Sequence, residues 1–455
     1  MQMARGVELL LQTLRCRFAH SDTAVCLPLA RSRGTFRRHK FGASHMTEMV
    51  HAGLGGLLLL AIAFAFSTNR RAINLRVVLS ALALQVAIGV FVFFLPVGQT
   101  VLQGMADGVG WLLAYGTSGI EFMFGPLVAE NIGFSFALNV LPVVIFFAAL
   151  MAVLYHVGIM QWIVVGVGWF LNKVLGTGRV ESLNASANIF VGQTEAPLVV
   201  KPYLEGITKP QLFAIMCSGL ASVAGTVLAG YAQMGIPLEY LLAASFMAAP
   251  GGLLMAKILM PDDKIKDEPQ NIIKPKLEVE RHANVLMAAA VGAKDGLNLA
   301  LNIGAMLIAF VSLIALLNGI LALIGGAVGV DGLSVQMILG WVFAPLMWAL
   351  SIPWEEARLA GSIVGEKIII NEFIAYLTYI GVADQFSERT QAILIVALCG
   401  FANLSSIGIL LGGLGSLIPD RLGDIAKFGL RAVLAGTLSN LMSASIAGML
   451  FLSSS

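Results

Sequence analysis

Long apolar segments constrain this chain more than any other feature. Segments of at least about 18 apolar residues with few charges are candidate transmembrane helices, because about 20 helical residues cross the hydrocarbon core of a bilayer. Only 12% of the residues are charged, against about 25% in soluble proteins. This composition disfavours a water-soluble enzyme, a disordered protein and a nucleic-acid-binding protein. The chain predicts an all-α polytopic membrane protein with eight transmembrane helices, at about 50–67, 75–97, 134–159, 211–232, 238–260, 295–325, 390–418 and 427–452.

The distribution of lysine and arginine predicts the orientation of these helices, because basic residues collect in cytoplasmic loops. Beyond position 45, every lysine and arginine except Arg358, Lys367 and Arg389 falls on one predicted side, whereas residues 98–133 contain none. With eight crossings, both ends of the hydrophobic core are then expected on the outer side. We expect a multi-pass protein of the plasma membrane, which in a bacterium is the inner membrane.

The first 45 residues differ from the rest. They contain eight basic and two acidic residues, and no apolar segment long enough to cross a bilayer. One interpretation is a basic cytoplasmic arm. The other is an N-terminal extension at 1–45 that is not part of the functional protein, with the natural start at Met46 or Met49. The second agrees better with the charge pattern, because a strongly basic arm on the outer side contradicts the rule for loops.

Two further segments, 181–210 and 341–380, are long enough to enter the membrane but are interrupted by polar residues, glycine and proline. Irregular backbone at membrane depth is stable only where it lines a protein cavity or water, so both segments are predicted to be re-entrant helical hairpins. Each precedes two apolar segments, and the two hairpins start from opposite sides. This order predicts an inverted repeat, which places a solute site at the midplane of secondary transporters.

The predicted elements divide the chain into five parts. After the extension come a scaffold with spans 1–3 and interfacial helices at 46–180, and a first transport unit with the first hairpin and spans 4–5 at 181–260. A cytoplasmic loop and span 6 follow at 261–340. A second transport unit with the second hairpin and spans 7–8 occupies 341–455.

Two glutamates stand at the predicted hairpin tips, Glu195 within GQTEAP and Glu372 within NEF. A carboxylate at bilayer depth costs about 3 kcal/mol or more and is a functional candidate by default. The alternative is a wet helix end or an ion pair, and the obvious partner of Glu372 is Lys367, five residues earlier.

Polar residues also interrupt two predicted spans, Ser222 within MCSGLASVAGTV and Asn403 and Ser406 within GFANLSSIG. Such stretches can unwind and offer carbonyls and hydroxyls to a cation or a sugar. The alternative is helix packing through small residues. Asn188, on the entering arm of the first hairpin, adds an amide oxygen to an oxygen-only cation site.

An enzymatic function finds little support in the sequence. It contains no HExxH, GxSxG or Walker A motif, and its four cysteines have neither metal-ligand nor disulfide spacing. A membrane pore remains a further alternative to a transporter.

Three motifs together resemble the concentrative nucleoside transporter family: NIFVGQTEAP at 188–197, KxxxNEFxxY at 367–376 and GFANxxS at 400–406. The resemblance extends over about 50–452. It implies eight spans with two re-entrant hairpins, a homotrimer with one path per protomer, and sodium-coupled symport of nucleosides, uridine-like ones first. Proton-coupled symport is the alternative, because Glu195 or Glu372 could titrate.

The resemblance also implies roles for individual residues. The nucleobase would meet Gln193, Thr194 and Glu195, with Val227 and Phe401 lining its pocket. The ribose would meet Glu372, Asn403 and Ser406. The co-transported sodium ion would be held by the side chains of Asn188 and Ser222 and by carbonyls around Val191 and Val223.

Overall fold

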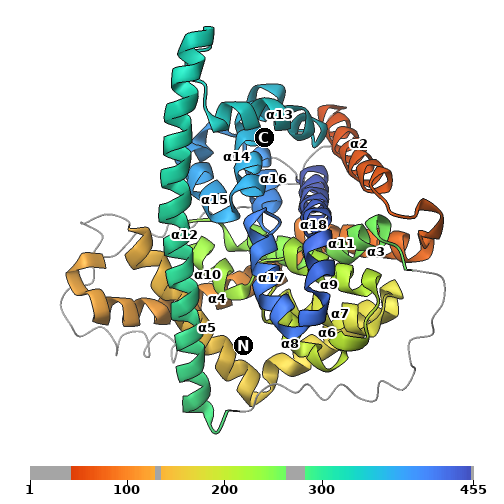
Figure 1. Ribbon diagram of the computed structural model, residues 1–455, viewed down its shortest axis with the longest axis vertical. Coiled ribbons are helices and arrows are strands. Elements are labelled where there is room, and N and C mark those ends of the chain that lie inside the picture. Colours follow the sequence, from red (N-terminus) through yellow and green to blue (C-terminus); the bar gives the residue numbers. More distant parts are fainter. Residues whose placement is uncertain (1–42, 129–134, 263–281, 452–455) are drawn as a thin grey trace, which may run out of the picture. The chain divides into compact units, whose positions relative to one another are not determined.

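The computed structural model describes residues 43–128, 135–262 and 282–451. Within these ranges the regular secondary structure consists of helices, without strands (Figure 1). The all-α prediction is therefore confirmed. Most of the predicted extension at 1–45, part of the loop within 261–340 and the C-terminal tail lie outside the described residues.

The helices that precede the first predicted hairpin are α2 (Ala43–Ala65), α3 (Leu75–Gly89), α4 (Pro96–Phe124), α5 (Leu141–Val157) and α6 (Ile159–Leu175). Helix α4 lies in the segment without lysine or arginine and is not apolar enough to cross a bilayer. It exposes Trp111 and Tyr115, whose rings meet edge to face at 4.7 Å. Exposed tryptophan and tyrosine are typical of helices at the membrane surface.

The rest of the chain contains two halves with the same order of elements, separated by helix α12 (Val285–Val328). Each half has short hairpin helices, then a helix interrupted near its middle, then a long helix (Figure 1). The first half consists of α7 (Arg179–Ala187), α8 (Ala196–Val199), α9 (Lys209–Ala221), α10 (Gly225–Gln233) and α11 (Leu238–Leu259). In the second half, helix α13 (Val335–Ala349) precedes α14 (Trp354–Ile369), α15 (Glu372–Val382), α16 (Glu388–Leu398), α17 (Ser405–Leu417) and α18 (Leu422–Leu450).

Among the described residues, seven helical segments are long and apolar enough to cross a membrane, one of them formed by α9 and α10 together, and they coincide with seven of the eight predicted spans. The predicted span at 390–418 differs, because residues 399–404 separate α16 from α17. An eighth candidate is the pair α13 and α14, which is bent by 119°. The bend lies inside the segment predicted as the second hairpin, 341–380. The hairpin itself is formed by α14 and α15, which meet at its tip between Ile369 and Glu372. The number of crossings stays a prediction.

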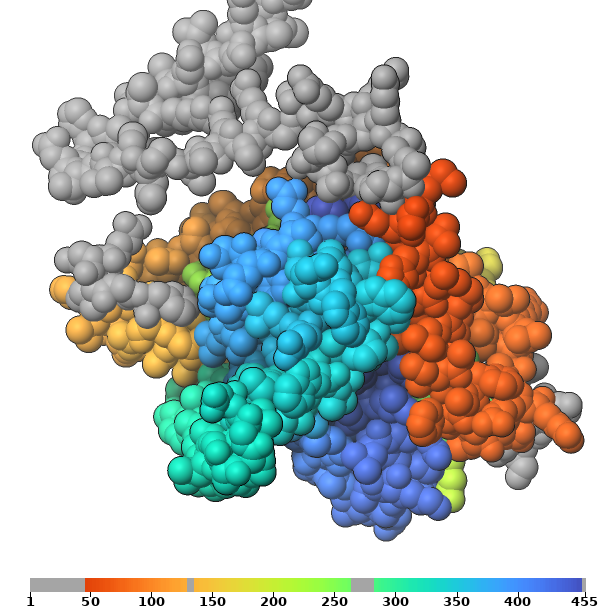
Figure 2. All heavy atoms as spheres, turned by 90° about the horizontal axis from the view of Figure 1, so that it is seen from above, coloured from red at the N-terminus to blue at the C-terminus, as the bar shows by residue number. Residues whose placement is uncertain are grey.

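Helix α12 is longer than the span predicted at 295–325. Its 44 residues extend for about 66 Å at 1.5 Å per residue, whereas the hydrocarbon core is about 30 Å thick. It packs closely on α5, since a Cβ atom added to Gly296 would lie 2.7 Å from the Cβ atom of Ala148. Figure 2 shows the surface of α13 and α14, in cyan, between those of α2, in red, and α12, in teal. Because α12 is about twice as long as the hydrocarbon core is thick, a crossing by this helix would require a steep tilt or would leave part of it outside the core.

The two interrupted helices meet at their breaks. The backbone N–H of Phe401, in the break between α16 and α17, donates to the carbonyl of Ser222, in the break between α9 and α10, over 3.1 Å. The N–H of Gly225 donates to the carbonyl of Phe190 at the first hairpin tip, over 3.0 Å. Bonds between elements thus replace helical bonds that the breaks remove, as buried backbone requires.

Candidate functional site

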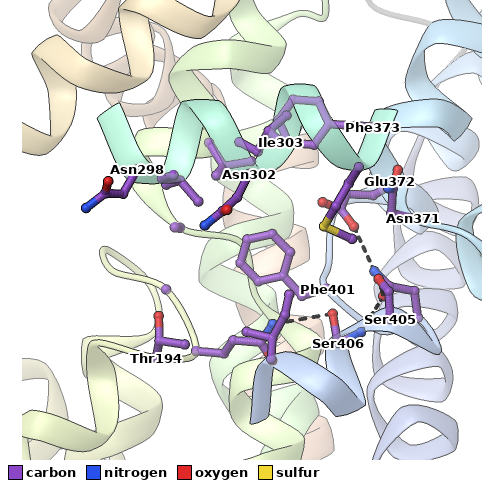
Figure 3. Close-up of a pocket in the computed structure, with 18 of the residues that line it drawn as sticks. Thr194, Asn298, Asn302, Ile303, Asn371, Glu372, Phe373, Phe401, Ser405 and Ser406 are labelled. Atoms are coloured by element: carbon purple, nitrogen blue, oxygen red, sulfur yellow. Dashed lines mark hydrogen bonds between the residues drawn. The ribbon is translucent and has the colours of Figure 1, made fainter. Parts of the chain in front are cut away.

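A cavity of about 580 Å³ lies where the two breaks, the two hairpin tips and α12 come together (Figure 3). Pockets for small molecules have volumes of about 300–1,000 Å³. All eight residues expected to meet a nucleoside line it: Gln193, Thr194, Glu195, Val227, Glu372, Phe401, Asn403 and Ser406. They come from both halves of the chain, so that neither half alone forms the cavity.

The first hairpin tip presents an amide and a hydroxyl to the cavity. Gln193 donates from Nε2 to Oγ of Ser406 over 3.3 Å, and its buried Oε1 has no hydrogen-bond partner among the described residues. The tip lies close to α17, because a Cβ atom added to Gly413 would be 2.5 Å from Cγ2 of Thr194. Gln193 therefore holds a free acceptor next to a donor, which is the pattern that a base edge requires.

The carboxylate of Glu372 is held by two donors. Its side chain is only 4% exposed. Glu372 is the first residue of α15, where the helix dipole favours a negative charge. Tyr231 Oη donates to Oε1 over 3.0 Å, and Asn403 Nδ2 donates to Oε2 over 2.9 Å. Asn403 in turn accepts from Ser405 Oγ at 2.7 Å and from the N–H of Ser406 at 2.8 Å. A carboxylate has about four acceptor positions, so this arrangement fixes Glu372 and leaves acceptors for hydroxyl groups.

Lys367 does not pair with Glu372, so the structure does not support the alternative interpretation of these two residues. The Nζ atom of Lys367 donates to Asn440 Oδ1 at 2.6 Å and to the carbonyl of Ala397 at 3.3 Å. No ion pair of Lys367 within 4.0 Å occurs in the part of the chain that the structure describes. The carboxylate oxygens of Glu372 therefore contact Tyr231 and Asn403 and not this ammonium.

The four residues expected to hold sodium do not line the cavity. They lie between α7 and α8 and at the break after α9. Asn188 donates from Nδ2 to the Asn184 carbonyl at 3.1 Å and to Ser218 Oγ at 3.4 Å. Its buried Oδ1 has no partner within the described ranges.

Ser222 extends the same oxygen-rich group. Its hydroxyl donates to the Ser218 carbonyl over 3.0 Å. This bond uses the hydrogen of the hydroxyl and leaves the lone pairs of Oγ as potential ligands for a cation. Val191 and Val223 both lie outside the helices, where carbonyls are not used by i→i+4 bonds. Amide, hydroxyl and carbonyl oxygens are the ligands that hard cations prefer.

Helix α12 supplies a wall that the motifs did not predict. Asp295, Asn298 and Asn302 line the cavity, and Figure 3 shows the two asparagines on the other side of Phe401 from Ser406. Their spacing of three and four residues puts them on one helix face, and this polar stripe in an apolar span was a signal available in the sequence. Tyr231, the donor to Glu372, had no such signal in its apolar segment.

Three family models match the chain. They are described as Na+ dependent nucleoside transporter N-terminus at residues 54–127, Nucleoside recognition at 137–238, and Na+ dependent nucleoside transporter C-terminus at 240–448. A protein of Helicobacter pylori named nucleoside permease NupC is 50% identical over 408 residues, 87% of this chain and 96% of that protein.

Solved structures of a protein named CNTnw have the same fold. One, described as inward-facing and substrate-bound, is 51% identical with a TM-score of 0.84, over 89% of this chain and 98% of that one. A variant of it, described as outward-facing, is 49% identical with a TM-score of 0.86, over 89% and 99% of the two chains.

Proposed function

Because the chain belongs to the family of Na+ dependent nucleoside transporters, whose members are transporters and not enzymes, we propose that it imports nucleosides into the cell by sodium-coupled symport. The observation that carries this proposal is that one cavity has Gln193 on one side and Glu372 on the other. An amide edge suits a nucleobase, and an ionised acceptor suits the vicinal hydroxyls of a ribose.

In this proposal the nucleoside lies between the two hairpin tips. Gln193, Thr194 and Glu195 meet the base, and Val227 and Phe401 cover its apolar faces. Glu372, Asn403 and Ser406 bind the ribose. Uridine is the first candidate, since its base offers both a donor and acceptors to Gln193.

The co-transported sodium ion binds next to the base contacts. Its ligands are Asn188 Oδ1, Ser222 Oγ and the carbonyls of Val191 and Val223. The unpartnered, buried Oδ1 atom of Asn188 supports this site, because a buried acceptor without a partner costs about 1–3 kcal/mol. An ion that orders the first hairpin tip strengthens nucleoside binding, and the coupling is reciprocal.

The two transport units move as one body past a scaffold that includes α12, in an alternating-access, elevator-like cycle. Likeness to chains described as inward-facing and as outward-facing supports this cycle. We place the protein in the plasma membrane, the inner membrane of a bacterium, with the ends of the hydrophobic core outside. Helix α12 exposes apolar side chains, including Ile308, Leu316 and Leu323. In a homotrimer, neighbouring protomers and lipid together would cover them.

Uptake by purified protein in liposomes tests this function. An inward sodium gradient should drive labelled uridine to a concentration above equilibrium, and a sodium ionophore should abolish the accumulation. Accumulation that follows a proton gradient in sodium-free buffer would select the proton-coupled alternative. Uridine flux that only equilibrates would indicate a pore, and absence of saturable uptake would contradict the nucleoside assignment.

Tyr231→Phe is expected to weaken uridine binding about tenfold. The variant removes the phenolic donor to Oε1 of Glu372, and a hydrogen bond to a charged group contributes about 1.5–3 kcal/mol. Titration calorimetry of the detergent-solubilised protein measures the change. Tyr379→Phe, on α15 beyond the cavity-lining residues, is the matched control, and equal losses in both variants would remove Tyr231 from the site.

A further inference from the structure

Lys367 is a buried cation that the proposed transport chemistry does not use. It lies in the last turn of α14 and is 1% exposed. Its ammonium donates to two neutral oxygens, Asn440 Oδ1 and the Ala397 carbonyl. Removing a charge from water costs several kcal/mol, and an apolar residue would avoid this cost. The position of the ammonium therefore calls for a reason beyond packing.

The partner amide, Asn440 on α18, joins the breaks of both interrupted helices. Its Nδ2 donates to the carbonyl of Ala221, the last residue of α9, over 2.6 Å. The same Nδ2 donates to the carbonyl of Cys399, the first residue after α16, over 3.0 Å. Because Lys367 occupies Oδ1 of this amide, the ammonium fixes the direction in which Nδ2 points. Lys367 thus acts on both breaks through one intermediary.

The position of Lys367 has a counterpart in the first half of the chain. There Asn188, at the end of the hairpin helix α7, contacts Ser218 in the last turn of α9. In the second half Lys367, at the end of the hairpin helix α14, contacts Ala397 in the last turn of α16. Each place lies beside the break of its own half. The first contains an unpartnered oxygen of Asn188, and the second contains an ammonium group.

We propose that Lys367 is a permanently attached cation, which serves the second half as the bound sodium ion serves the first. It is a positioning residue for nucleoside binding. Through Asn440 it holds the break that carries Phe401 and Asn403, and it balances the charge of Glu372 without contacting that carboxylate. Each hairpin then combines one glutamate with one cation, supplied by the solution at Asn188 and by the chain at Lys367. This inference rests on the proposed function, because it takes uridine and sodium as the ligands.

Two substitutions test the proposal. Lys367→Met removes the charge and leaves an unbranched side chain one atom shorter than lysine, and Lys367→Gln is equally short but keeps an N–H donor for Asn440. Uridine affinity should fall about tenfold in both variants, as measured by titration calorimetry in saturating sodium. The rise in melting temperature on adding sodium without uridine should persist, because Lys367 contacts none of the proposed sodium ligands and Asn440 reaches the first break only at the Ala221 carbonyl. Lys201→Met, which alters an exposed lysine near the first hairpin, is the control and should change neither quantity.

The possible outcomes separate this inference from the function on which it rests. A Lys367→Gln variant that binds uridine like the wild type would show that a hydrogen bond suffices, and would overturn the role of the charge. Loss of the sodium response together with a lower melting temperature of the unliganded protein, in both variants, would indicate a merely structural lysine. A wild-type protein that binds uridine without any response to sodium would instead contradict the sodium-coupled function.

Discussion

Glu372→Gln is expected to weaken uridine binding about 30- to 150-fold. In the structure the two carboxylate oxygens accept from Tyr231 and Asn403, both of which are donors. A glutamine must turn its NH₂ group toward one of these donors or toward the ribose, and it carries no charge to strengthen the remaining bond. Loss of a charge-assisted hydrogen bond costs about 2–3 kcal/mol, which corresponds to the stated range of dissociation constants.

The measurement is best made with a set of ribose analogues. The wild type should discriminate uridine from 2′-deoxyuridine or 3′-deoxyuridine, whichever lacks the hydroxyl that Glu372 binds, and Glu372→Gln should lose this discrimination. Glu355→Gln is the matched control, since Glu355 is an exposed acid at the start of α14 in the same hairpin. Uridine affinity that is unchanged in Glu372→Gln would exclude the carboxylate from the binding site.

Asn188→Ala is expected to abolish the sodium dependence of uridine binding. Coupling between two ligands commonly changes affinity 5- to 150-fold, and the ratio of uridine affinities with sodium and with choline should fall to about one. The reason is the loss of the buried Oδ1, the one side-chain amide oxygen among the proposed sodium ligands. Affinity in the absence of sodium should change little, because Asn188 does not line the cavity.

The matching control for this experiment is Asn298→Ala. Asn298 is an asparagine of α12 that lines the cavity but has no place in the proposed sodium site. It should keep the wild-type ratio even if its absolute affinity changes. A normal sodium ratio in Asn188→Ala would place the ion elsewhere, and the melting temperature of each variant verifies that it is folded.

Local patterns singled out Glu195, Glu372, Asn403 and Ser406, because each stands in a polar interruption of an apolar segment, whereas Val227 and Phe401 were implied only by the family resemblance. Gln193 and Glu372 mark places where a membrane helix cannot continue, and the physics of unsatisfied backbone brings such places together. The same reasoning did not predict that residues of α12 line the cavity. Asn298 and Asn302 form a polar face, but only the tertiary packing determines whether that face meets a cavity, a neighbouring helix or water.

The relation between Lys367 and Glu372 also required the structure. Five residues of continuous chain suggest an ion pair, but α14 ends at Ile369 and α15 begins at Glu372. The chain changes direction between the two side chains, and each then finds partners more than 25 residues away along the sequence, at Ala397 and Asn403. Sequence distance is a poor guide wherever a hairpin tip lies between two residues.

The contact between the interrupted helices uses main-chain atoms, the N–H of Phe401 and the carbonyl of Ser222. This backbone hydrogen bond does not depend on which side chains stand at positions 222 and 401. Substitutions around positions 222 and 401 can therefore alter which base or which ion is accepted while the attachment between the two halves persists. A change of nucleoside preference would then require substitutions only at residues that contact the nucleoside, and the hydrogen bond between the two interrupted helices would be kept.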